Sequence, residues 1–249
     1  MSKFIKSLAV ISALAIFGAG FISCKDDEDN DTTPTTTNTG FEGKYYNINV
    51  INKLKPVAGE NDIPYAQCSV EEVIFKKDGS GTYKIHQMEY DSEDGRQRFN
   101  LKEDFHYTKS GQTLKFTVQN EEMEFTIKSE DKLACENDER EYDKGAIEEI
   151  YAYLNIESSS KTATSKVIIL GKDGSANFRN LVSDFEIGKM PGYETENWSS
   201  TYEKTDTTDT TTITFRRDTT GAETIGTLSV DEDSGITYLK IGEEKYRKL

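Results

Sequence analysis

From residue 41 onward, apolar and polar positions alternate with a period of two, which is the pattern of half-buried β-strands. The clearest apolar rows are Tyr83 and Ile85, then Leu114, Phe116 and Val118, then Met123, Phe125 and Ile127. Turn signals separate the rows: Asp78-Gly79-Ser80-Gly81, Asp94-Gly95, Ser110-Gly111-Gln112 and Glu130-Asp131. The pattern predicts about eight short strands between Gly43 and Tyr142 and no helix longer than one turn, at 144–150.

The second half of the chain repeats the first at an offset of about 95 residues. Residues 73–84 (VIFKKDGSGTYK) align with 168–179 (IILGKDGSANFR), with four identities at the turn. Residues 113–116 correspond to 212–215, and the ends 141–144 correspond to 245–248. Because the matches keep their order, we predict a tandem duplication with copies at 41–145 and 146–249, each large enough for its own core.

The first forty residues follow a different pattern. Lys3 and Lys6 precede an apolar segment, Leu8 to Ile22, as in a secretory signal peptide. At about fifteen residues the segment is shorter than the roughly 20 that span a bilayer as a helix, although an uncleaved anchor is the alternative. Residues 25–40 contain no apolar residue and cannot bury enough surface to fold, so 24–40 is predicted to be a tether.

The apolar segment ends at Phe21-Ile22-Ser23-Cys24, which resembles the lipobox of bacterial lipoproteins, with Phe21 where that family usually has Leu. The resemblance implies removal of 1–23 and acylation of Cys24 with chains such as palmitate. Lys25, Asp26, Asp27 and Glu28 resemble the export signal of Bacteroidota surface lipoproteins; the alternative is a self-repelling solvated tether. Together these resemblances imply a lipid-anchored outer-membrane protein that faces the cell exterior and contacts the membrane through its anchor alone.

The charge of the chain argues against one class of partner. Removing 1–23 removes Lys3 and Lys6 and changes the formal net charge from −15 to −17. Nucleic-acid binders need clustered Lys and Arg to displace counterions, so we expect no nucleic-acid partner.

The hairpin signals of the first copy resemble those of lipocalin-like domains common in Bacteroidota lipoproteins. The matching segments are 43–46 (GKYY), 75–83 (FKKDGSGTY), 105–108 (FHYT) and 111–114 (GQTL). The resemblance covers 41–144 moderately well and 150–249 weakly; it departs at Tyr45, where Trp is frequent, and in a long insertion, Lys53 to Gln67. It implies an all-β protein of two tandem antiparallel barrels, each with about eight strands and either a filled interior or one small ligand. A β-sandwich is the alternative.

An open interior would place a row of aromatic residues around the ligand. The candidate lining residues are Tyr83, Phe105, Phe116 and Phe125. Trp198, the sole tryptophan, follows Met190-Pro191 in a predicted loop, where it is a candidate sugar or partner platform or a plug of one barrel end.

The remaining cysteines, Cys68 and Cys135, both lie in the first copy. In an exported protein they are a candidate disulfide. In the chain-entropy model, closing the loop between them would stabilise the fold by roughly 3 to 5 kcal/mol. Alternatively, Cys135 is a buried free thiol, because it shares the parity of Leu133.

Signals for catalysis are weak. The two histidines, His86 and His106, lie near Glu89 and Asp104, but strand histidines among charged neighbours are usually solvated. The chain lacks a nucleophile elbow, a phosphate loop and zinc spacings, and its second copy has no histidine or cysteine. We therefore predict no catalytic residue, metal site or cofactor, and no enzyme; a glycan hydrolase needs only two carboxylates and stays a remote alternative.

Asp-Thr-Thr occurs four times and resembles the Bacteroidota O-glycosylation acceptor, which would mark Thr32, Thr207, Thr210 and Thr219; a threonine-rich composition produces the same motif. The leading functional hypothesis is non-enzymatic binding of a small molecule, glycan or lipid by the barrels of a surface lipoprotein. The alternative is a structural or interaction subunit of an outer-membrane assembly.

Overall fold

The computed structural model describes residues 40–56, 62–91, 95–157, 161–185 and 192–249. Within these residues it contains sixteen strands and no helix, so the predicted all-β class is confirmed. The predicted lipidation site Cys24, the export signal from Lys25 to Glu28, and Thr32 lie outside the described residues.

The first barrel contains the first eight strands in sequence order. They are β1 (Gly43–Lys55), β2 (Ile63–Phe75), β3 (Ser80–Asp91), β4 (Gly95–Ser110), β5 (Thr113–Val118), β6 (Glu121–Ser129), β7 (Lys132–Cys135) and β8 (Glu141–Lys144). Each strand is antiparallel to the next, and β8 pairs back with β1 at Tyr45 and Tyr46, which closes the barrel.

The second barrel repeats this order. Its strands are β9 (Ile147–Glu157), β10 (Thr162–Gly171), β11 (Ser175–Asp184), β12 (Gly192–Asp206), β13 (Thr211–Arg217), β14 (Glu223–Val230), β15 (Thr237–Ile241) and β16 (Glu244–Lys248). It closes where β16 pairs with β9 at Tyr151 and Ala152. Two closed barrels in tandem were expected and are confirmed, which removes the β-sandwich alternative.

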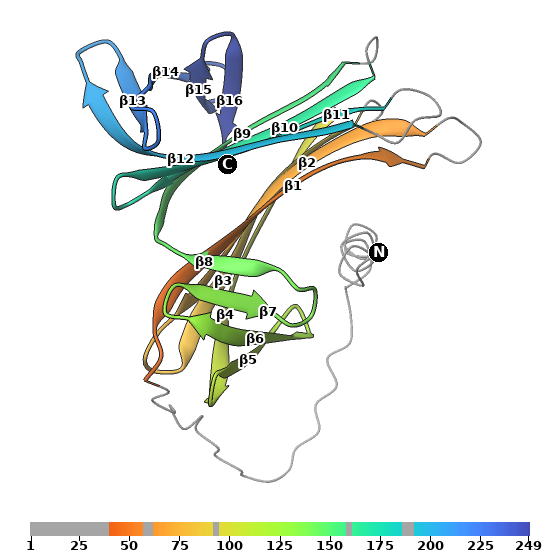
Figure 1. The fold of residues 1–249 in the computed structure, drawn as a ribbon, viewed down its shortest axis with the longest axis vertical. Coiled ribbons are helices and arrows are strands. Elements are labelled where there is room, and N and C mark those ends of the chain that lie inside the picture. Colours follow the sequence, from red (N-terminus) through yellow and green to blue (C-terminus); the bar gives the residue numbers. More distant parts are fainter. Residues whose placement is uncertain (1–39, 57–61, 92–94, 158–160, 186–191) are drawn as a thin grey trace.

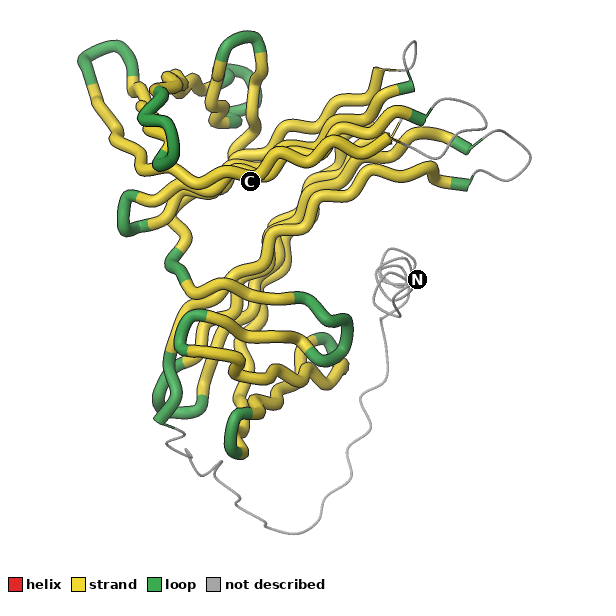
Figure 2. The backbone as a smooth tube through the Cα atoms, in the orientation of Figure 1, coloured by secondary structure: helices red, strands yellow, loops and turns green. Residues whose placement is uncertain are grey.

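The first four strands of each barrel are much longer than the pattern predicted. The segment 53–67 was expected to be an insertion, but its residues 53–55 and 63–67 continue the first hairpin: Lys53 pairs with Tyr65, and Lys55 pairs with Ile63. Because β4 pairs with β5 only from Tyr107 onward, β1 to β4 continue beyond the closed part as an open four-stranded sheet (Figure 1). We call this sheet the first extension; β9 to β12 form the corresponding second extension (Figure 2).

The closed end of the first barrel is filled by aromatic rings. Phe75 lies at its centre and makes edge contacts with Tyr107, Phe105 and Phe116 at centroid distances of 5.0, 5.7 and 5.8 Å. Phe105 and Phe116 stack on each other at 4.0 Å. Such offset and edge-on pairs stabilise a core beyond the area that they bury, so this end of the barrel is a packed core.

The two extensions pack back to back. Cys68, Val70 and Met88 of the first extension share one buried cluster with Ala152 and Val167 of the second, which we call the inter-barrel core. Strand β1 contacts β10 and β11, and β9 reciprocally contacts β2 and β3. This reciprocity is the mark of a two-fold interface, here formed by two copies within one chain.

A buried amide links the two extensions. Asn52 Nδ2 donates to the backbone oxygens of Ala163 and Leu181 at 2.8 and 2.9 Å, and Asn52 Oδ1 accepts from Ser165 Oγ at 2.5 Å. Because a buried polar group without partners is costly, these three bonds fix the position of β1 on β10 and β11.

Local details also repeat between the barrels. In the β2–β3 turn, Asp78 accepts from the backbone and hydroxyl of Ser80, and Asp173 accepts the same two bonds from Ser175 in the β10–β11 turn. The glycines that follow these aspartates have φ of 81° and 82°, a conformation that favours glycine. The shared turn chemistry explains the four-residue identity that exposed the repeat.

Candidate functional site

The inner face of the first extension, which lies opposite the inter-barrel core, is polar. Cross-strand partners in an antiparallel sheet point to the same face. One row across the extension is formed by Asn49, Ser69, Gln87 and Phe99. The next row towards the strand tips is Ile51, Gln67, Glu89 and Gln97, and the row after it begins with Lys53 and Tyr65. We call these residues the inner face.

Hydrogen bonds and ring contacts hold the inner face in place. The Tyr65 hydroxyl lies 2.8 Å from Gln67 Oε1 and 2.7 Å from Glu89 Oε2. Lys53 Nζ lies 4.8 Å from the centroid of the Tyr65 ring. The backbone beneath is rigid because the opposite face of the sheet is buried in the inter-barrel core. Ser69, Gln87 and Tyr65 are buried, so the accessible amides and carboxylate of the inner face are those of Asn49, Gln67, Glu89 and Gln97. Amides and a carboxylate in this arrangement can bond to several hydroxyl groups of one ligand.

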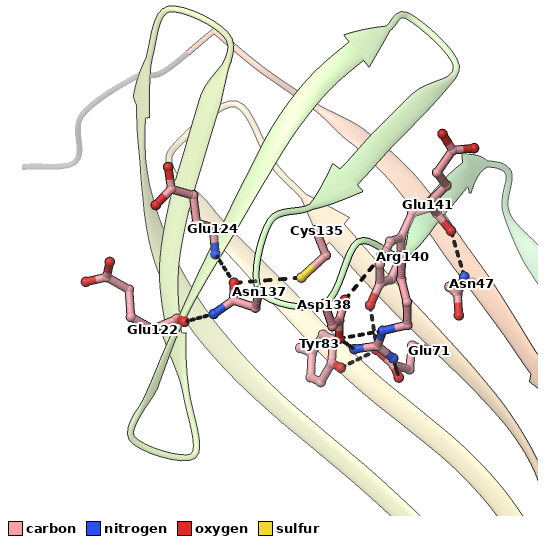
Figure 3. Close-up of polar contacts among 11 residues, drawn as sticks. Asn47, Glu71, Tyr83, Glu122, Glu124, Cys135, Asn137, Asp138, Arg140 and Glu141 are labelled. Carbon is pink, nitrogen blue, oxygen red and sulfur yellow. Dashed lines mark hydrogen bonds and ion pairs between the residues drawn. The ribbon is translucent and has the colours of Figure 1, made fainter. Parts of the chain in front are cut away.

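A buried charged network lies where the inner face meets the aromatic core (Figure 3). Glu71, with only 5% of its surface exposed, accepts hydrogen bonds from the hydroxyls of Tyr83 at 2.6 Å and Tyr142 at 2.5 Å. Glu71 also forms an ion pair with Arg140, whose Nε donates to Asp138 Oδ2 at 2.6 Å. Strands β2, β3 and β8 and the loop between β7 and β8 are therefore joined through the carboxylate of Glu71.

The protonation of the two tyrosines follows from this arrangement. Burial, and secondly the charge of Glu71, raise the pKa values of Tyr83 and Tyr142 well above that of free tyrosine. Both hydroxyls therefore stay protonated near neutral pH and act as donors to Glu71. The network is arranged for structural support rather than for proton transfer.

The second barrel has the corresponding ion pair with its charges exchanged. The offset of the repeat places Lys166 at the position of Glu71, and the matched chain ends place Glu244 at the position of Arg140. Lys166 and Glu244 form an ion pair, and the Tyr246 hydroxyl donates to Glu244 at 2.7 Å. Thus the site of the ion pair is shared by the barrels, whereas its polarity is not.

The aromatic residues proposed to line a ligand cavity lie within the core instead. Tyr83, Phe105, Phe116 and Phe125 are all buried, and Phe116 stacks on Phe125 at 5.5 Å as well as on Phe105. Side chains from facing strands fill the space that a ligand would need at this end. Only the Tyr83 hydroxyl reaches the polar network, through Glu71.

Trp198 lies in strand β12 and not in the predicted loop. Its ring stacks on that of Phe178 with a centroid distance of 3.5 Å. The guanidinium of Arg217, on β13, lies 4.3 Å from the centroid of the Trp198 ring. The tryptophan is half-buried, and it packs against the core of the second barrel. Trp198 therefore contributes to the packing of the second barrel.

The predicted disulfide is wrong, because Cys68 and Cys135 are free thiols in different cores. Cys68 points into the inter-barrel core, whereas Cys135 belongs to the aromatic core of the first barrel. Burial raises the pKa of each thiol to about 12, with a smaller contribution from Asp138 at Cys135. The alternative of a buried free thiol at Cys135 is therefore the one observed.

The two histidines do not share a site. His86 is opposite Asn100 and His106 is opposite Ser80, so they lie six register positions apart, roughly 20 Å along the strands. Among the described residues, no group of three or more His, Cys, Asp or Glu side chains is placed to hold a metal ion. A search of the same residues finds no helix with the length and hydropathy of a membrane span.

The candidate modification sites that the structure describes are exposed. Thr207 and Thr210 lie in the β12–β13 turn, where the backbone nitrogen of Thr210 donates to the hydroxyl of Thr207 at 3.1 Å. Thr219 lies in the β13–β14 turn. Their glycosylation stays a prediction.

Sequence reasoning missed the inner face and the Glu71 network. Only Lys53, Tyr65 and Gln67 of the inner face fell within the segment assigned to an insertion; the other polar positions were interpreted as the solvent-facing side of the strands. Glu71, by contrast, carried a usable signal: it shares the parity of Val73 and Phe75, so an acidic residue interrupts an inward-facing apolar row. Its partners could not be found in this way, because Arg140 is 69 residues away.

The chain was compared with protein-family profiles, curated protein sequences and solved structures, and none of the three comparisons gave a match.

Proposed function

We propose that this protein is a non-enzymatic, lipid-anchored binding protein of the outer membrane, exposed on the cell exterior, and that it binds glycans on the inner face of the first extension. The proposal rests on one observation above all: the inner face combines amides, carboxylates and aromatic rings on a sheet whose back is fixed. Sugars present hydroxyl groups and apolar ring faces, which these residue types bind by hydrogen bonds and stacking.

The filled barrel end favours a surface site over an enclosed one. A lipocalin-like domain that holds its ligand inside needs an interior free of side chains, and Phe75, Phe105 and Phe116 occupy that interior here. The inner face lies beyond this plug, where the strands continue without a closing partner.

A glycan array followed by calorimetry on the bound glycans tests the proposal. We expect Gln67→Ala combined with Gln97→Ala, two accessible amides of the same inner-face row, to weaken binding at least about tenfold, because each amide would contribute about 1 kcal/mol. Gln112→Ala, in the exposed β4–β5 turn, is the matched control and should bind as the parent protein does. Absence of binding to any glycan, or equal affinity in the double variant, would contradict the proposal.

The anchor is tested separately from the binding site. In a bacterial host fed a radiolabelled palmitate, the full-length protein should incorporate label and Cys24→Ala should not. Brief treatment of intact cells with a protease should digest the protein if it faces the exterior. An unlabelled, protease-protected protein would remove the proposed location and leave the binding experiment unaffected.

A second candidate function, an interaction subunit, is favoured by two apolar side chains on β14. Ile225 and Val230 are 61% and 62% exposed, on opposite faces of the strand. Cross-linking on intact cells should give a defined product that Ile225→Asn combined with Val230→Asn abolishes. An unchanged cross-linking pattern in that variant would exclude β14 as the contact.

A further inference from the structure

Two arginines from different barrels face each other across the edge of the inter-barrel core. Arg98 lies on β4 opposite Met88, and Arg247 lies on β16 opposite Ala152. Met88 and Ala152 belong to the same inter-barrel core, and cross-strand partners share a face, so both arginines point towards this seam. The seam lies on the opposite side of the first extension from the inner face.

A third arginine fixes the geometry of the seam. Arg96, two residues before Arg98 on the same face of β4, donates from Nη2 to the backbone oxygen of Leu154 at 3.0 Å. Its guanidinium also lies 4.9 Å from the ring centroid of Tyr90. Because Leu154 belongs to β9, this bond holds β4 against β9 of the second barrel, two residues from Ala152, the partner of Arg247.

The two arginines lack acidic partners, although the chain has a net charge of −15. Within the described ranges, neither Arg98 nor Arg247 forms an ion pair with a carboxylate, and the buried Nε of Arg247 has no hydrogen-bond partner. Asn100 is a neutral neighbour, whose oxygen accepts from Arg98 at 3.2 Å in the amide orientation that satisfies both groups. The charge of Arg247 adds to burial in lowering the pKa of Arg98, so the two groups repel each other.

Like charges held together without counterions are costly, and an unsatisfied buried guanidinium nitrogen adds to this cost. A bound oxyanion would remove both costs at once, because guanidinium groups pair with phosphate and sulfate through two parallel hydrogen bonds. We propose that the seam is a binding site for a phosphate or sulfate group, held between Arg98 and Arg247. The site takes a tetrahedral oxyanion either as the free ion or as an ester on a larger molecule.

Calorimetry on the purified mature protein tests the proposal with four probes: sodium sulfate, sodium phosphate, glucose 6-phosphate and glucose 6-sulfate, each at matched ionic strength in chloride. We expect saturable binding of at least one probe, and Arg98→Gln and Arg247→Gln should each weaken it about tenfold or more. Arg216→Gln is the matched control, since Arg216 is exposed on β13 and already paired with Glu223 at 2.9 Å. Tighter binding of the sugar esters than of the inorganic ions would identify an ester as the ligand.

Two results would overturn the proposal. One is the absence of saturable binding of all four probes up to about 50 mM, a concentration that detects even weak ligands. The other is unchanged binding in Arg98→Gln, a substitution at an exposed position where the fold is expected to persist. If Arg247→Gln does not fold, Arg98→Gln alone decides the outcome. Loss of binding in Arg216→Gln would equally count against the seam.

Discussion

The exchanged ion pairs of the two barrels allow a test by charge reversal. Glu71 and Arg140 in the first barrel correspond to Lys166 and Glu244 in the second. Arg140→Glu would place two carboxylates together, and Glu71→Lys would place an ammonium beside a guanidinium. The double variant Glu71→Lys/Arg140→Glu restores an attractive pair in the polarity that the second barrel already uses, and we expect it to be more stable than either single variant.

The magnitudes follow from the burial of the pair. The side chains of Glu71 and Arg140 are 6% and 18% exposed, so breaking the pair should cost about 3 to 5 kcal/mol in each single variant. The double variant should recover about 3 kcal/mol or more relative to the sum of the single losses. A residual cost of about 1 to 3 kcal/mol is expected because the Tyr83 hydroxyl loses its acceptor. A further cost is expected because the buried carboxylate of Asp138 loses its bond to Arg140.

A third substitution should remove part of this residual cost. The repeat places Phe178 of the second barrel at the position of Tyr83, so adding Tyr83→Phe deletes the orphaned hydroxyl. Tyr142 corresponds to Tyr246, which donates to the carboxylate of Glu244, and it should donate to the carboxylate introduced at position 140. The triple variant should therefore be the most stable of the reversed set.

Urea unfolding followed by circular dichroism measures these free energies, and the fluorescence of Trp198 reports the second barrel separately. The control is the reversal of Lys132 and Glu141, a pair at 3.0 Å with side chains 49% and 60% exposed, where each single variant should change stability by less than about 1 kcal/mol. If the double variant at Glu71 and Arg140 loses the full sum of the single losses, the correspondence between the two ion pairs is refuted.

Three further predictions concern other parts of the molecule. Asn52→Ala should cost about 2 to 4 kcal/mol and separate the unfolding transitions of the two barrels in circular dichroism and Trp198 fluorescence; coincident transitions would contradict this. Cys68 and Cys135, each with a pKa of about 12, should be thiolate only to about one part in 10⁴ at pH 8, so a disulfide reagent should label them only after unfolding, and intact mass should show two free thiols. Burial alone would raise the pKa of Glu149, but hydrogen bonds from two lysines and a tyrosine lower it below the value in the unfolded chain. Glu149 therefore stabilises the fold fully above a pH of about 4.3, and this stabilisation is lost as the pH falls through the lower folded-state pKa. In an acid titration, the free energy of unfolding of Glu149→Gln should fall less steeply than that of the parent protein.

The parts of the fold that could be predicted depend on local sequence. The expected turns at 78–81, 110–112 and 130–131 connect successive strands, and the rows around Phe116 and Phe125 face the core as their parity indicated. The expected turn at Asp94-Gly95 lies partly outside the described residues. These signals are local because a turn and a period of two need only neighbouring residues. The internal repeat also predicted the second barrel, although the hairpin motifs of that half resemble known lipocalin-like hairpins only weakly.

The parts that were missed depend on distant residues. The long strands of the first extension carry polar residues on their inner face, and their opposite face packs against the second barrel. The sequence of segment 53–67 therefore did not show the alternation of apolar and solvent-exposed positions that marks a half-buried strand. The predicted disulfide was wrong for the same reason. Nothing in the sequence near Cys68 indicates that the face of β2 carrying this residue is covered by β9 and β10. Packing between the two copies was the information that the pattern lacked.

The joining of two copies in one chain has a consequence for how their interface can vary. In a symmetric dimer every substitution appears twice, so a residue must suit both halves of the interface. Here only residues 145 and 146 separate β8 from β9, and each half can change alone. Val70 and its counterpart Ser165 show the result: one is apolar, whereas the other bonds to Asn52 across the interface. Each half of the interface can therefore differ in sequence while the reciprocal contacts of the two extensions are kept.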